Sequence, residues 1–350
     1  MHGRREFLAA LGAAGAAGLS HLRGGYGAQA RGRFGVQAAP GAGDRIDTHH
    51  HVFPQPYVAA LAQAGRADGI AKSWSVERTL EDMDRAGVRT AILSVTQPAT
   101  TFAEPAVARR VARESNEWVA KLIRDMPGRF GLFALVPMPN VDDTLKEIEY
   151  ALDTLKADGV GFMTSYGDRW LGHQSFAPVM DELNRRRAVV YTHPTTAPCC
   201  GGLLPSIPDT VVEFGTDTSR TITDIVFSGT AARCEDARFI FSHGGGTVPF
   251  LMERFTRLPV QNAAMKARVP NGVMHELTRF YYDTAWVAHP PALAALTKFV
   301  PVSQILLGSD YPYRTGEDHV RGLADYGFSD ADGRAIGREN ALRLLPRLRG

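Results

Sequence analysis

Short apolar runs alternate with amphipathic segments along most of this chain. Helical patterns cover residues 75–87, 106–128, 141–159 and 176–187, and the first has Ser75 as its N-cap and Gly87 as its stop. Eight apolar runs predict β-strands, at residues 45–47, 90–95, 129–135, 160–164, 188–192, 238–242, 280–283 and 304–308. Strands that alternate with helices form βαβ units around a parallel sheet. With eight strands, the pattern predicts an α/β fold of the (β/α)8 TIM-barrel type.

The chain before residue 45 has a different composition. Residues 1–30 place adjacent Arg4 and Arg5 before a weakly apolar Ala/Gly run and end in the small residues of "AQA". This arrangement predicts a twin-arginine export signal, and an Ala-rich segment with a chance arginine pair is the alternative. The run is shorter than the roughly 20 residues of a membrane span. We therefore expect a signal at 1–30, a linker at 31–44, a barrel at 45–350 and a periplasmic or otherwise exported protein.

Composition narrows the function classes. The 350 residues are 44% hydrophobic and 22% charged, and their net charge of +2 gives no reason to expect a nucleic-acid surface. Cys199, Cys200 and Cys234 are too few for a disulfide framework. The adjacent pair could line a pocket, form a vicinal disulfide or simply pack, and packing is the default. Segments 52–73 and 194–220 are long for barrel loops, so we expect lids or small insertions over the functional face.

Side chains able to bind a metal follow several predicted strands. They are His49 and His51 in "DTHHHVF", His193 in "YTHP", His243 in "SHGGG" and Asp310 in "LLGSDYP". Strand ends meet at one mouth of a barrel, so these side chains should converge there. His49 and His51 should point the same way and His50 the opposite way, because side chains alternate along a strand. The three glycines of "SHGGG" should let backbone approach a ligand and leave amides free for an anion.

Three imidazoles and a carboxylate could bind one divalent cation and leave one histidine for proton chemistry. Nitrogen-rich ligation favours zinc, and manganese is the alternative. For His193 and His243 taken alone, a satisfied core or surface histidine is the alternative, and for "DTHHHVF" the alternative is a polar turn rich in histidine.

Several motifs of the chain resemble those of a known family. The motifs "DTHHHVFP", "GRFGLFALVPMP", "SHGGGTVPFLMERF", "YYDTAW" and "LLGSDYP" are similar to those of the amidohydrolase superfamily. The similar branch holds aminocarboxymuconate-semialdehyde decarboxylase and aromatic decarboxylases, above all the 6-methylsalicylate decarboxylase-like proteins. This resemblance implies that His49, His51, His193 and Asp310 hold the metal and that His243 is catalytic. It also implies a homodimer, with Arg254 reaching a substrate carboxylate, in some members across the dimer interface; a plain surface arginine is the alternative.

Two departures from the family pattern refine the expectation. The fourth strand, in "GVGFMTS", lacks the lysine that binuclear members carry, which favours one metal ion. Ile70 stands where the muconate decarboxylase has an arginine, which favours a less charged substrate such as a hydroxybenzoate.

We therefore expect metal-dependent, non-oxidative decarboxylation of a small aromatic carboxylic acid of the hydroxybenzoate or salicylate type. Asp310, or a water relayed by His243, would protonate the ring carbon. Phe53, Trp74, Tyr166 or Trp286 could form aromatic walls, with Trp74 and Tyr166 assigned to substrate binding. A metal-dependent hydrolase of a lactone, ester or amide, with His243 as base, is the alternative, and export fits it better. A non-catalytic metal-binding protein is a third possibility.

Overall fold

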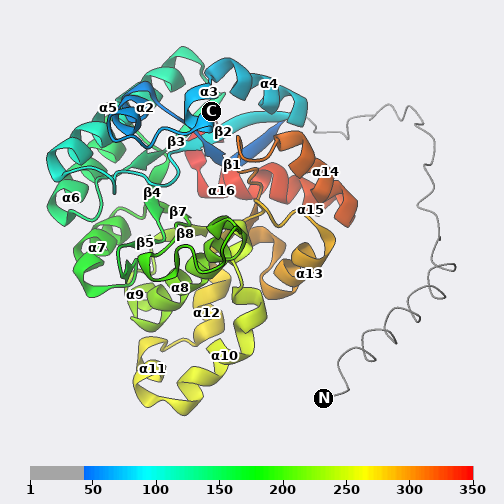
Figure 1. Cartoon of the computed structure of the whole chain (residues 1–350). Coiled ribbons are helices and arrows are strands. Elements are labelled where there is room, and N and C mark those ends of the chain that lie inside the picture. The colour runs from blue at the N-terminus through cyan, green and yellow to red at the C-terminus, as the bar shows by residue number, and fades with distance from the viewer. Residues whose placement is uncertain (1–42, 350) are drawn as a thin grey trace, which may run out of the picture. The chain divides into compact units, whose positions relative to one another are not determined.

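The computed structural model describes residues 43–349, so the predicted export signal and nearly all of the predicted linker lie outside the described residues. Within this range eight parallel strands follow one another around a barrel, confirming the predicted fold (Figure 1). Each strand overlaps one of the predicted apolar runs. The strands are β1 (Arg45–His51), β2 (Val88–Ser94), β3 (Phe130–Leu135), β4 (Gly159–Met163), β7 (Val189–His193), β8 (Arg238–Phe241), β9 (Tyr281–Asp283) and β10 (Ile305–Leu306).

Backbone hydrogen bonds between β1 and the chain after β10 join the two ends of the sheet. Thr48 N donates to Leu307 O over 2.9 Å, and Asp310 N donates to His49 O over 2.8 Å. His51 N donates to Tyr311 O over 2.8 Å. These bonds bring the two ends of the strand order together and place Asp310 beside the histidines of β1.

Helices surround the strands. The predicted caps of α4 are present, since the Ser75 side chain accepts from Arg78 N and Gly87 takes a left-handed conformation. The predicted helix at 141–159 is α6 continued by a π-helical turn, Tyr150–Thr154. The helices are α2 (Gln55–Gln63), α3 (Gly69–Ser73), α4 (Val76–Ala86), α5 (Pro105–Asp125), α6 (Val141–Glu149), α7 (Ala177–Arg185), α8 (Glu213–Phe227), α9 (Thr230–Arg233), α10 (Val248–Gln261), α11 (Ala263–Arg268), α12 (Val273–Arg279), α13 (Pro290–Phe299), α14 (Gly316–Tyr326), α15 (Asp330–Arg334) and α16 (Asn340–Leu344).

The longer loops carry small elements. Segment 52–73 forms α2 and α3, and segment 194–220 passes through short turns into α8. A two-stranded hairpin of β5 (Ser165–Tyr166) and β6 (Arg169–Trp170) follows β4. Within residues 43–349 no helix is both long and apolar enough to cross a membrane.

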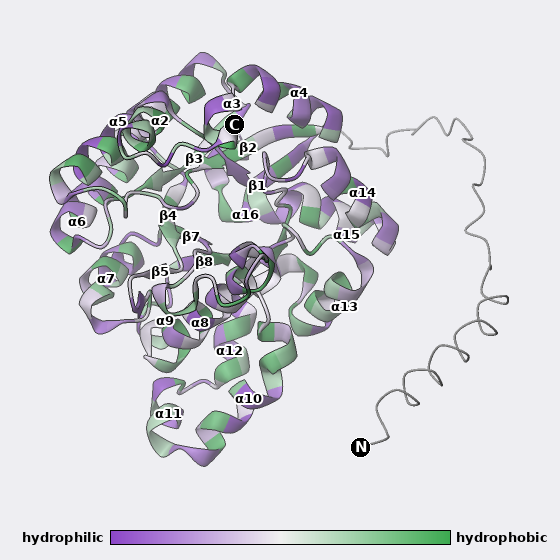
Figure 2. Ribbon diagram, viewed as in Figure 1, coloured by the Kyte–Doolittle hydropathy of each residue, from purple (hydrophilic) through white to green (hydrophobic). Residues whose placement is uncertain are grey.

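The apolar core has two parts, one inside the barrel and one between strands and helices. Side chains of α16 join the inner part, so this C-terminal helix packs against the side chains that fill the barrel. Figure 2 shows hydrophilic residues concentrated along α4 and α14. The inner part comprises Ile46, Ile92, Phe133, Val189, Tyr191, Ile240, Leu306, Ala341, Leu344 and Leu345. Tyr191 stacks on Phe133 and also meets the His49 ring edge-on, so the packed interior supports one of the metal-binding histidines.

Candidate metal centre

Four of the predicted site residues converge at the C-terminal ends of the strands. One ligand atom from each of His49, His51, His193 and Asp310 lies within 4.8 Å of the others, and all four residues are buried. His51 Nε2 is 2.8 Å from Asp310 Oδ1, and His49 Nε2 is 3.2 Å from the same oxygen. The barrel thus assembles a compact group of three imidazoles and one carboxylate from β1, β7 and the chain after β10.

The outer nitrogen of each imidazole has an oxygen partner. His49 Nδ1 lies 2.9 Å from Asp283 Oδ2, and His193 Nδ1 lies 2.8 Å from Pro194 O. His51 Nδ1 lies 3.2 Å from Ser94 O. Because each Nδ1–H donates outward, Nε2 remains available to a metal, the arrangement common among metal-binding histidines. Asp310 Oδ1, buried between these nitrogens, makes no hydrogen bond with the described residues. The donor set therefore fits one divalent metal ion.

The electrostatics of the cluster also suit a cation. Burial alone would lower the pKa of His49, but the carboxylates of Asp283 and Asp310 outweigh it and raise the pKa to about 10. Burial would raise the pKa of Asp310, yet its histidine partners hold it well below its usual range. Burial and the neighbouring histidines push the pKa of His193 well below its usual value, so this ligand is neutral. Without a metal, His49 holds a proton where a cation could bind.

Asp283 supports this centre, and the sequence reasoning gave it no role. Its Oδ2 binds His49 Nδ1, while its Oδ1 accepts from the backbone N–H groups of His243 and Ala285, each over 3.0 Å. It stands at the end of β9, in the "YYDTAW" motif. Its position at a strand end, like that of the metal-binding residues, was the available signal.

His243 lies beside the group of four. Its Nε2 is 3.4 Å from Asp310 Oδ2, and its ring centroid is 5.1 Å from that of His49. A group here can exchange a proton with Asp310 or with a substrate near the metal.

Two of the three glycines after His243 use their N–H groups within the turn. The N–H groups of Gly245 and Gly246 donate to backbone oxygens of the same turn. A Cβ on Gly246 would lie 2.1 Å from Gly215 O of α8. The expectation of free amides is therefore wrong at these two positions, because the tight turn against α8 uses them.

His50 points away from the cluster, as strand alternation predicts. Its Nδ1 lies 2.9 Å from Asp47 Oδ2, and its ring stacks on Tyr311. The pairing of β1 with β2 is irregular between Asp47 and His50, which lets these two side chains meet despite their odd spacing. His50 therefore belongs to the support of the strand.

Two predicted substrate-binding residues lie in packed surroundings, and the third is exposed. Trp74 packs against Trp118 of α5 and against Phe53, with ring centroids 6.2 and 6.5 Å apart. Tyr166 is buried, and its hydroxyl accepts from Met163 N over 2.9 Å. These contacts show how the two side chains pack, and their assignment to substrate binding stays a prediction. Arg254 is exposed on α10 and makes no ion pair or hydrogen bond within residues 43–349.

Three other aromatic residues lie beside the cluster. The Trp286 indole N–H donates to Asp310 Oδ2, and the residue is 51% exposed. Tyr313 meets the His51 ring edge-on with centroids 5.8 Å apart, and Phe214 meets His193 at 5.9 Å. We call Trp286, Tyr313 and Phe214 the aromatic rim. Among them only Trp286 was named from the sequence; Tyr313 follows Asp310 closely in "SDYPY", which was the missed signal.

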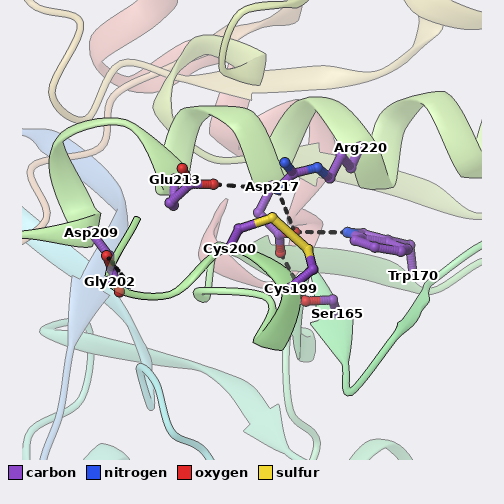
Figure 3. Close-up of a disulfide and its surroundings, with 9 residues drawn as sticks. All are labelled: Ser165, Trp170, Cys199, Cys200, Gly202, Asp209, Glu213, Asp217 and Arg220. Atoms are coloured by element: carbon purple, nitrogen blue, oxygen red, sulfur yellow. Dashed lines mark hydrogen bonds and ion pairs between the residues drawn. A yellow bond between two sulfur atoms is a disulfide. The ribbon is translucent and has the colours of Figure 1, made fainter. Parts of the chain in front are cut away.

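The segment after β7 starts and ends beside the centre, at His193 and Phe214. Cys199 and Cys200 form a vicinal disulfide in this segment, in place of the simple packing expected by default (Figure 3). Near the disulfide in Figure 3, Asp217 of α8 accepts from the Trp170 indole N–H over 2.7 Å and from the Ser165 hydroxyl over 2.9 Å. These bonds tie α8, which follows the segment, to the hairpin after β4.

Comparison with known proteins agrees with this geometry. A 6-methylsalicylic acid decarboxylase of Aspergillus aculeatus is 37% identical, over 87% of this chain and 97% of its own. A decarboxylase of Aspergillus niger is 36% identical, over 87% of this chain and 88% of the relative's length. A dihydroxybenzoic acid decarboxylase from a Polaromonas species, solved with manganese and 2-nitroresorcinol, has a TM-score of 0.73 at 20% identity, over 89% and 98%, and so shares the fold. The amidohydrolase family profile matches residues 46–347, which confirms the resemblance seen in the motifs, and the chain belongs to the amidohydrolase family.

Proposed function

We propose that this protein is a metal-dependent, non-oxidative decarboxylase of a small aromatic carboxylic acid of the hydroxybenzoate or salicylate type. The observation that carries the proposal is the buried group of three histidines and Asp310 with His243 beside it, bordered by the aromatic rim. The amidohydrolase relatives at 36–37% identity are named decarboxylases, and one of them acts on 6-methylsalicylate.

The finer assignment of the metal is part of this proposal. His49, His51, His193 and Asp310 would hold it, and three nitrogen ligands with one oxygen suit zinc, with manganese as the alternative. Manganese is the ion named in the Polaromonas structure. A bound ion would supply Lewis acidity and hold the substrate carboxylate and its neighbouring hydroxyl together.

The chain's own groups would move the proton. Losing carbon dioxide directly from a ring would leave an aryl anion, so the carbon bearing the carboxylate is protonated first. Asp310 Oδ2 and His243 Nε2, 3.4 Å apart, form the pair that holds and delivers this proton. The bond to the carboxylate carbon then breaks, its electrons restore the aromatic ring, and carbon dioxide leaves. The aromatic rim would flank the ring and reduce access of water.

A hydrolase would use the same residues differently, with His243 as a base that activates water. The chain after β4 reads Thr164 and Ser165, without a lysine for a second metal, and this absence favours the decarboxylase.

The deciding experiment is an activity panel on purified protein loaded separately with zinc and with manganese. Release of carbon dioxide from salicylates and hydroxybenzoates would be measured beside hydrolysis of lactones and esters, with a chelated sample as control. Metal-dependent carbon dioxide release is the expected result. Hydrolysis without carbon dioxide release would reject the decarboxylase in favour of the hydrolase.

We also propose a homodimer in which Arg254 reaches a substrate carboxylate across the interface. Phe250 is 76% exposed and lies one turn from Arg254 on the same face of α10. Leu203, Leu204 and Val211, in the segment after β7, are exposed as well. Light scattering should give a dimer that Phe250→Glu weakens, and Arg254→Ala should raise KM. If the wild type is a monomer and KM is unchanged in both variants, neither the dimer nor the role of Arg254 in substrate binding holds.

We further propose that residues 1–30 direct export by the twin-arginine route. Replacing Arg4 and Arg5 with lysines should retain the protein in the cytoplasm, as measured by cell fractionation. Equal export of the two forms would point to another route.

A further inference from the structure

Trp286 joins the buried metal centre to solvent. The residue is 51% exposed, yet its indole N–H donates to the carboxylate of Asp310, which is only 4% exposed. A large aromatic side chain exposed to this degree gains little from packing in its own core. Its position therefore calls for another explanation than burial.

The two oxygens of Asp310 have separate surroundings. Oδ1 faces His49 Nε2 and His51 Nε2, at 3.2 and 2.8 Å. Oδ2 faces His243 Nε2 and the Trp286 indole N–H. The Asp310 carboxylate cannot rotate about its Cβ–Cγ bond without losing the hydrogen bond from the Trp286 indole N–H. The indole therefore keeps Oδ1 directed at the histidines and Oδ2 at His243.

The backbone around this oxygen is constrained as well. His243, Trp286 and Asp310 have φ angles of +55°, +58° and +67°, a region that non-glycine residues seldom adopt. These three residues come from the ends of different strands, and their side chains meet at one carboxylate oxygen. Unfavourable backbone conformations that cluster at one point are retained where the geometry of a functional site depends on them.

We propose that Trp286 is a positioning and specificity residue with two separable tasks. Its N–H fixes Asp310 so that one oxygen serves the metal and the other serves His243. Its exposed ring forms a wall for the aromatic substrate. The second task rests on the proposed function, whereas the first depends only on metal binding at the four predicted ligands.

Two substitutions separate these tasks. Trp286→Phe keeps an aromatic wall and removes the donor, while Trp286→Gln keeps an N–H donor and removes the wall. Trp118→Phe is the matched control, since this tryptophan of α5 packs against Trp74. Metal dissociation constants would be measured by competition with a chelator, and kcat and KM would be measured by carbon dioxide release. Quenching of tryptophan fluorescence would report the binding of salicylate.

Trp286→Phe should weaken metal binding and lower kcat by roughly 10-fold each, the usual size for loss of an outer partner of a metal ligand. Its KM should stay within about 2-fold, because the wall remains. Trp286→Gln should restore most of the metal affinity but raise KM by roughly 3–10-fold. Salicylate should quench the tryptophan fluorescence of the wild type and of Trp118→Phe more strongly than that of Trp286→Phe, which keeps three other tryptophans.

The outcomes distinguish this inference from the proposed function. Wild-type protein that binds metal but releases no carbon dioxide would reject the decarboxylase, and the metal affinities of the variants would still test the hold on Asp310. Metal affinity in Trp286→Phe equal to that of Trp118→Phe would overturn the positioning role. A KM in Trp286→Gln equal to that of the wild type would overturn the wall.

Discussion

At the residue scale, neighbouring histidines of one strand have different tasks. His49 and His51 face the metal centre, while His50 binds Asp47 and stacks on Tyr311. The pleat of the strand sends alternate side chains to opposite faces, so one step along β1 changes the function of an imidazole.

This difference predicts unequal effects of two substitutions in β1. His51→Ala should abolish stoichiometric metal binding, because it removes one of four ligands. His50→Ala should keep the metal but lower the free energy of unfolding by at least about 2 kcal/mol, because it removes a buried ring and takes a hydrogen-bond partner from Asp47. Metal content by elemental analysis and unfolding in urea would measure both. Equal loss of metal in the two variants would contradict the observed facing of His50.

His243 allows a second prediction at this scale. His243→Asn should keep the metal, because the four ligands remain, and should lower turnover by roughly 10²–10⁴-fold, the usual size of general acid–base catalysis. Metal analysis and kinetics on this variant decide between roles. A metal-free variant would make His243 a ligand, and a fully active one would make it structural.

At the element scale, the turn between β8 and α10 depends on glycine. Gly246 has a φ of +65°, and a Cβ there would lie 2.1 Å from the backbone oxygen of Gly215. The turn carries His243, so its close fit against α8 also sets where that side chain points.

Gly246→Ala should therefore lower the free energy of unfolding by at least about 2 kcal/mol, from backbone strain and the clash together. Gly333→Ala is the matched control, because Gly333 lies in α15 with no atom near its Cβ position. It should be neutral or add up to about 1 kcal/mol through helix propensity. Unfolding curves of the two metal-loaded variants would measure the difference. Similar stabilities would show that the turn can move away from α8.

At the scale of the whole molecule, metal binding and protonation are coupled. In the metal-free protein His49 has a pKa raised to about 10 by Asp283 and Asp310 despite its burial. Its contribution to stability is complete below the unfolded value near 6.5 and is lost as the pH rises toward 10. A metal must displace this proton, so metal affinity should change in the opposite direction.

We expect the metal dissociation constant to fall by up to about tenfold per pH unit between pH 7 and 9.5. Over the same range the protein whose metal has been removed by a chelator should lose thermal stability. Asp283→Asn is the control, since it removes one of the two charges that raise the pKa of His49, and it should flatten both slopes. Competition with a buffered chelator and thermal unfolding would provide the data. A dissociation constant independent of pH in the wild type would show that His49 is already neutral.

Much of the architecture follows from the sequence alone. All eight predicted strand runs coincide with strands of the barrel, because apolar runs between turn residues are local signals of the chain. The positions of His49, His51, His193 and Asp310 at strand ends place them at one mouth once the fold is a barrel. Even the opposite facing of His50 needs only the alternation of a strand.

The partners of these residues were decided by the tertiary structure. Asp283 holds His49 from 234 positions away, and Trp286 holds Asp310, while Trp74 and Tyr166 pack into apolar surroundings. Gly245 and Gly246 of "SHGGG" lie against α8 and donate their N–H groups within the turn instead of leaving them for an anion. Periodicity along a chain sets which face a side chain takes. Which atoms it meets there depends on strand register and on loops folding back over long separations, and no local pattern contains that information.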